Sequence, residues 1–118
     1  MASRGEILDA LADYSQRCNG NEKLRRMLQG WTRLLHFQAS DSGEVFTVQV
    51  TDGRIVATAA GASRDADLVV SATSEDLCDM FWGDLNPVQK YMNGEIVVRG
   101  NPADVMRLDA MASLIWAG

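Results

Sequence analysis

The chain has 118 residues, which suits one domain, and its 47% hydrophobic and 23% charged residues are ordinary for a globular protein. Its net charge of −5 excludes the basic footprint with which nucleic-acid-binding proteins neutralise phosphates. We therefore expect a single domain over residues 1–118 that binds no nucleic acid.

The two cysteines suggest a reducing compartment. Cys18 and Cys78 are far apart in the sequence and belong to no metal-ligand or redox motif. The first residues lack the apolar run of a signal peptide. No window approaches the roughly 18 apolar residues that a membrane span needs. We expect a soluble, cytoplasmic protein that holds no metal and no cofactor.

Helix signals fill the first quarter of the chain. Ser3 and Glu6 have the S-x-x-E spacing of a capping box, and the apolar residues that follow recur with a helical period. The Asn-Gly pair at 19–20 interrupts this pattern, which then restarts and ends near Gly30. Two helices are therefore predicted within residues 1–30.

Strand signals follow from residue 31. Residues 31–39 alternate with a period of two, which favours a strand, with a helix as the alternative. Residues 45–60 hold the pair Asp52-Gly53 between two alternating runs, which strongly indicates a β-hairpin. A sheet is therefore predicted to begin with these segments.

A two-residue turn would fix the register of this hairpin. It would place Val48 opposite Ala57 and Phe46 opposite Ala59, so that all four residues share one dry face of the sheet. Bulky β-branched residues are more usual than alanine at such positions. The two alanines would either let a helix approach closely or leave a void over the sheet.

Capping residues and turn residues divide the second half of the chain into short helices and strands. An Asn-Pro pair is typical of a helix start. We expect an α/β (α+β) fold with one sheet and a helical layer. The predicted elements are a strand within 65–73, a helix capped by Thr73 or Ser74 and ended by Gly83, a helix from Asn86-Pro87 through Met92, a short strand over 95–99, and a final helix from Asn101-Pro102.

The last helix has apolar residues on two sides. At roughly 100° per residue, one dense stripe and a second stripe on the far side are separated by polar residues. One stripe is expected to pack on the sheet, and the other to meet a helix, a protein partner or an apolar ligand. The first stripe consists of Val105, Leu108, Ala112 and Ile115, and the second of Met106, Ala110 and Leu114.

Residues 66–108, ADLVVSATSEDLCDMFWGDLNPVQKYMNGEIVVRGNPADVMRL, resemble the sterol-carrier-protein (SCP-2-like) lipid-binding family. The run FTVQVTDGRI at 46–55 resembles the central hairpin of that family. The resemblance implies a mixed five-stranded sheet covered on one face by helices, with an apolar tunnel between them. It also implies non-covalent binding of sterols, fatty acids, fatty acyl-CoA or phospholipids. Lys90 departs from the small residue that is frequent at its position in the family.

We expect large, flexible apolar side chains to line the tunnel, because such side chains adapt to hydrophobic ligands. The expected ligand is a lipid or another hydrophobic small molecule, with transient membrane contact during transfer. The expected ligand-binding residues are Phe46, Val48, Phe81, Trp82, Met92, Met106, Met111 and Trp116.

Two alternatives remain open. The domain could serve a biosynthetic pathway, as an accessory subunit or as an enzyme such as a cyclase, and the last helix could hold a homodimer or another partner. Conventional catalytic groups are scarce, since His36 is the only histidine and no catalytic carboxylate stands at an obvious spacing from it. Asp76 and Asp79 would raise the pKa of the Cys78 thiol, which disfavours a nucleophile. We assign no catalytic residue.

Overall fold

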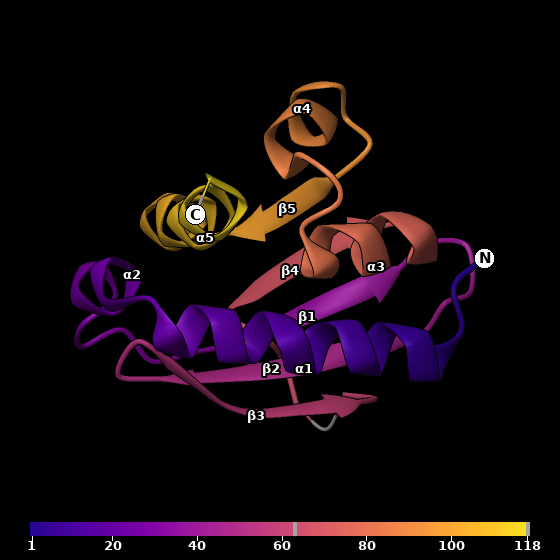
Figure 1. Cartoon of the computed structure of the whole chain (residues 1–118). Helices are drawn as coiled ribbons and strands as arrows, with labels where there is room; N and C mark the ends of the chain where they lie inside the picture. Colours follow the sequence, from indigo (N-terminus) through magenta and orange to yellow (C-terminus); the bar gives the residue numbers. More distant parts are fainter. Residues whose placement is uncertain (63, 118) are drawn as a thin grey trace.

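The computed structural model describes residues 1–62 and 64–117, with side chains up to Ser113. Helices gather on one face of a single sheet (Figure 1). The elements are α1 (Arg4–Gly20), α2 (Glu22–Met27), β1 (Arg33–Ala39), β2 (Val45–Thr51), β3 (Arg54–Ala60), β4 (Leu68–Ala72), α3 (Ser74–Trp82), α4 (Pro87–Met92), β5 (Val97–Gly100) and α5 (Pro102–Ala117).

The sheet is mixed and five-stranded, as predicted. Its strand order is β3-β2-β1-β4-β5, with β1 and β4 parallel and the other neighbours antiparallel. Leu35 and Phe37 of β1 point to the helical face beside Val48 and Phe46 of β2. The sequence interpretation of residues 31–39 as a strand is therefore confirmed.

The core lies between the helical face of the sheet and the helices α1 and α3. The Phe81 ring of α3 meets the Phe37 ring edge-on, with 5.0 Å between the ring centroids. The Tyr14 ring of α1 lies 5.4 Å from the same Phe81 ring. Such aromatic pairs bury large apolar areas, so these three rings hold both helices against the sheet.

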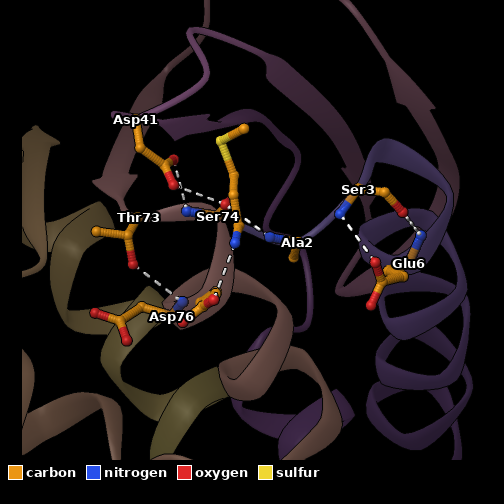
Figure 2. A network of polar contacts seen from close by, with 9 residues as sticks. Ala2, Ser3, Glu6, Asp41, Thr73, Ser74 and Asp76 are labelled. Atoms are coloured by element: carbon orange, nitrogen blue, oxygen red, sulfur yellow. Dashed lines mark hydrogen bonds and ion pairs between the residues drawn. The ribbon is translucent and has the colours of Figure 1, made fainter.

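Polar contacts join the start of the chain to the first turn of α3 (Figure 2). The Ser74 hydroxyl accepts a hydrogen bond from the Ala2 amide at 3.1 Å and donates one to the Asp41 carboxylate at 2.8 Å. The Ser74 amide and hydroxyl together lower the pKa of Asp41. Thr73 caps α3, so Ser74 is free to make these tertiary contacts.

The Asp52-Gly53 turn forms where the sequence predicts it. Both residues have positive φ, 48° and 76°, as a two-residue hairpin turn requires. A Cβ atom added to Gly53 would lie 2.8 Å from the Leu28 carbonyl oxygen, so the turn also packs tightly against the end of α2. Glycine is required here both for its conformation and for its size.

The predicted register of the hairpin is wrong beyond its first pairs. A β-bulge between Gln49 and Val50 of β2 leaves Val56 as an extra residue on β3. Val48 therefore pairs with Thr58 instead of Ala57. Beyond the bulge, each residue of β3 therefore points to the opposite face of the sheet from the one predicted.

This change of register overturns the expected void. Ala57 and Ala59 are exposed residues on the opposite face of the sheet from Phe46, which now pairs with Ala60. Each residue added to one strand exchanges the two faces of the sheet for all residues beyond it. The two alanines consequently neither pack against a helix nor border a cavity on the helical face.

Candidate ligand-binding cavity

A buried carboxylate fixes the first turn of α5. The Asp104 carboxylate accepts a hydrogen bond from the indole Nε1 of Trp31 at 2.9 Å and another from Nε of Arg33 at 3.0 Å. Burial acts to raise the pKa of Asp104, but the hydrogen bonds from Trp31 and Arg33 and the nearby positive charges outweigh it, so the pKa is lowered. These bonds set the position of α5 relative to β1.

The two apolar sides of α5 have different surroundings. Met111, on the edge of the helix that carries Asp104 and next to the dense stripe, is only 1% exposed within the core. Met106, on the other side, is 74% exposed. Helix α5 contacts α2, α4 and β5, and α4 lies beside it over the β5 end of the sheet (Figure 1). Of the second stripe, Met106 is therefore open to solvent, whereas Ala110 is half-buried and packs against the core.

A cavity of about 320 Å³ lies between α4, α5 and the helical face of the sheet. This volume is at the lower end of the roughly 300–1,000 Å³ range that is usual for small-molecule sites. Apolar side chains from three strands and four helices form most of its wall. The lining residues are Tyr14, Phe37, Val70, Met80, Pro87, Val88, Tyr91, Ile96, Val98, Val105, Met106, Leu108, Asp109 and Ala112.

The cavity has an inner end in the core and an outer end at the surface. Phe37 and Val70 at the inner end are almost completely buried. Val88, Tyr91 and Met106 at the outer end are exposed large apolar residues. We call these three side chains the rim. A ligand could therefore place an apolar tail against the sheet and a polar end at the rim.

Polar groups are few in this wall. Asp109 is the only charged residue among the described lining, and the tyrosine hydroxyls of Tyr14 and Tyr91 are the other strong hydrogen-bonding side-chain groups. Burial raises the pKa of Tyr14 well above its ordinary value, so this phenol stays neutral. The cavity thus combines an apolar interior with one anionic group.

Of the eight expected binding residues, Met106 lines the cavity. Phe46 and Val48 lie on the helical face of β2, away from the cavity wall, and are completely buried. Phe81 and Met111 are buried in the core. None of these four side chains lines the cavity, although the Phe81 ring packs against that of the lining residue Phe37.

The remaining expected residues lie at or beyond the surface. Trp82 ends α3 and Met92 ends α4, and both side chains are exposed without lining the cavity. The side chain of Trp116 lies outside the described residues. Of the seven expected residues whose side chains are described, only Met106 lines this cavity.

Residues that the sequence reasoning did not choose make up most of the wall. Val70 and Val98 point to the same face because β4 and β5 pair there. Val105 and Ala112 belong to the dense stripe of α5 that was expected to pack on the sheet. Asp109 is one of the polar residues that separate the two stripes, and it lies between Val105 and Met106 around the helix, so a charge between two apolar stripes is the signal that could have located this cavity.

The side chains considered for catalysis lie elsewhere. His36 points to the face of the sheet opposite Phe37, where its Nε2 atom is buried without a hydrogen-bond partner. Burial and, next, the charge of Asp79 raise the pKa of the Cys78 thiol. Neither group reaches the cavity wall, so the cavity offers no nucleophile from these residues.

Within the described residues, no group of three or more His, Cys, Asp or Glu side chains is arranged to hold a metal ion. None of the described helices has both the length and the apolar character that crossing a bilayer requires.

Comparison with protein families gives one match over most of the chain. The sequence model of the SCP-2 sterol transfer family matches residues 11–113. The human protein hydroxysteroid dehydrogenase-like protein 2 (Homo sapiens) is 37% identical over 49 residues, which are 42% of this chain and 12% of that protein. This chain therefore corresponds to a small part of the length of the curated relatives that it matches.

Comparison with solved structures shows the same fold. A crystal structure of sterol carrier protein 2 superposes with a TM-score of 0.70 at 17% identity, covering 92% of each chain. The solution structure of palmitated SCP2L2 from Aedes aegypti superposes with a TM-score of 0.64 at 16% identity, covering 97% of this chain and 95% of that one.

Proposed function

This chain belongs to the SCP-2 sterol transfer family, and on that premise we propose that it binds a hydrophobic small molecule non-covalently in the cavity beside α5 and carries or presents it. The apolar cavity between α4, α5 and the sheet is the observation that carries this proposal. Apolar voids of this size destabilise a protein when they stay empty, so a ligand that fills the cavity gains binding free energy.

Apolar burial supplies the driving force. Each methylene that leaves water contributes about 0.8 kcal/mol, so a chain of about twelve carbons gains on the order of 10 kcal/mol. A bilayer offers the same lipid a similar gain, and the protein therefore needs only a comparable site that is already formed. Pre-formed walls on β1, β4 and β5 keep the ordering cost of binding low.

The proposed ligand is a single-chain lipid or a molecule of similar size. The family description names sterol transfer, and the Aedes aegypti structure is described as palmitated, which supports a lipid ligand for this chain as well. We propose that the exposed rim, Val88, Tyr91 and Met106, touches a membrane transiently while the lipid enters. Two buried free cysteines support a cytoplasmic setting.

Native mass spectrometry of the purified protein, followed by organic extraction, tests the proposal directly. We expect a co-purified lipid, or displacement of an apolar fluorescent probe when lipid is added. Ala112→Phe, in the cavity wall, should weaken probe binding by roughly tenfold or more, because a phenyl ring fills the space.

The matched control is Ala59→Phe, on an exposed position of β3. This control should bind the probe like the wild type. Equal probe binding by Ala112→Phe and wild type, with both proteins folded, would contradict binding in this cavity. An apo mass without any response to probe or lipid would contradict lipid binding altogether.

A further inference from the structure

Asp109 lies between the two apolar stripes of α5, on the side of the helix that forms the cavity wall. It follows Val105 by one helical turn and precedes Ala112 by three residues, and all three residues line the cavity. Asp109 is exposed, as are the lining residues Met106 and Tyr91. The carboxylate therefore stands at the outer end of the cavity, where the polar end of a bound lipid would lie.

No lysine or arginine offsets this negative charge in the described wall. The cavity lining includes no basic residue. Lys90 of α4 is held by two other carboxylates, with its Nζ 3.2 Å from Glu95 and 3.6 Å from Asp76. Arg107 of α5 projects about 160° around the helix from Asp109, at roughly 100° per residue. The outer end of the cavity is thus anionic.

We infer that the cavity selects lipids with an uncharged headgroup that donates a hydrogen bond, such as a hydroxyl, and disfavours those that end in a carboxylate or phosphate. Asp109 is the residue that determines this selection. The inference rests on the proposed function, because it assigns a headgroup preference to the same cavity.

The chemistry of the two headgroups differs at this position. A hydroxyl can donate a hydrogen bond to the Asp109 carboxylate and accept one from the phenol of Tyr91, and hydrogen bonds to ionised acceptors are the stronger kind. A fatty acid carboxylate has no proton to donate and repels Asp109. This repulsion is partly screened by salt because the site is exposed, so the preference should be moderate.

Three ligands with the same twelve-carbon chain separate these effects: dodecanol, methyl dodecanoate and dodecanoate. Displacement of an apolar fluorescent probe at pH 8 measures their affinities for the wild-type protein. We expect dodecanol to bind most tightly, the ester less tightly, and dodecanoate about fivefold to tenfold more weakly than dodecanol. The tail contributes equally in all three ligands, so the order reports the headgroup alone.

Asp109→Asn removes the charge and keeps the size of the side chain. This variant should bind dodecanoate about fivefold more tightly than the wild type and change the affinity for the ester by less than about twofold. Asp9→Asn, on an exposed position of α1, changes the net charge equally and does not line the cavity. It should leave all three affinities unchanged.

The outcomes distinguish lipid binding by the cavity from its headgroup preference. If none of the three ligands displaces the probe, the proposed function fails. If dodecanoate binds wild type as tightly as dodecanol, or if Asp109→Asn leaves the dodecanoate affinity unchanged, the headgroup preference is overturned while lipid binding stands. If Asp9→Asn strengthens dodecanoate binding as much as Asp109→Asn does, net charge alone explains the effect and the role of Asp109 is rejected.

Discussion

The indole of Trp31 and the carboxylate of Asp104, 73 positions apart in the sequence, share a buried hydrogen bond of 2.9 Å. This bond joins the residue just before the sheet to the first turn of the helix that forms the cavity wall. The carboxylate also lies at the positive end of α5, which adds a favourable interaction with the helix dipole. The position of the wall thus depends on a polar contact between two residues that do not themselves line the cavity.

Asp104→Ala should destabilise the protein by about 2 kcal/mol, because the Trp31 indole N–H would lose its partner while it stays buried. Urea unfolding followed by fluorescence measures the change in free energy. Trp31→Phe removes the donor and keeps most of the ring, so the double variant should cost less than the sum of the two single changes. Additive costs would show that the bond contributes nothing.

Stability should also depend on pH through Asp104. Its pKa is lowered in the folded state, so its contribution is present above the unfolded value, about 3.9, and is lost as pH falls through the folded pKa. The difference in free energy of unfolding between wild type and Asp104→Asn should therefore shrink below about pH 4. Thermal melts from neutral to acidic pH measure it, and a constant difference would contradict this linkage.

Gly53→Ala should be more damaging than Gly43→Ala. Both glycines have φ near +77°, at 76° and 78°, but only Gly53 lies against the Leu28 backbone, whereas no atom lies within 4 Å of a Cβ on Gly43. Gly43→Ala should cost about 1 kcal/mol from backbone conformation alone. Gly53→Ala should lower the free energy of unfolding clearly more, as measured by urea unfolding. Equal losses in the two variants would show that the Leu28 backbone moves away from the added Cβ without an energetic penalty.

Cys18 should resist alkylation in the native protein. Burial raises the pKa of its thiol to about 12, so almost no thiolate exists at pH 8. Mass spectrometry after iodoacetamide treatment should show Cys18 unmodified in the native protein and modified in urea. Rapid native labelling of Cys18 would indicate that the end of α1 opens locally, because Cys18 is a buried residue of that helix.

Met106→Asp tests the proposed membrane contact of the rim. Transfer of a fluorescent fatty alcohol from vesicles should slow several-fold, because an added charge at an exposed position disfavours insertion into lipid. Val56→Asp, at the exposed bulge of β3, adds the same charge on another surface and should transfer at the wild-type rate. Equal slowing in both variants would point to net charge instead of the rim.

Local signals in the sequence predicted most of the fold. The capping box at Ser3 and Glu6, the caps at Thr73 and Asn86, and the turn at Asp52-Gly53 all form as the residues indicate. Each depends on contacts between residues close in sequence, which is why a single sequence suffices to find them. The bulge beside Val56 has no such signal, because it only appears when two strands are paired.

The site was harder to predict because its residues are brought together by the tertiary arrangement. Choosing side chains by type gave Phe46 and Met111, which the core buries, and Met92, which faces solvent. The wall instead contains ordinary valines such as Val70 and Val98, whose role depends on which strand stands next to α5. The pattern of α5 indicated two apolar sides, but not that the dense stripe, which was expected to pack on the sheet, borders the cavity.

The bulge in β3 has a consequence for how this molecule meets its own copies. Strand β3 is one of the two outer strands of the sheet, and a long flat outer strand invites pairing with a neighbouring chain. The inserted Val56 bends the strand and disturbs the regular row of backbone donors and acceptors that such pairing needs. The same bulge that shifts the hairpin register thus disfavours aggregation of this protein through the β3 edge at high concentration.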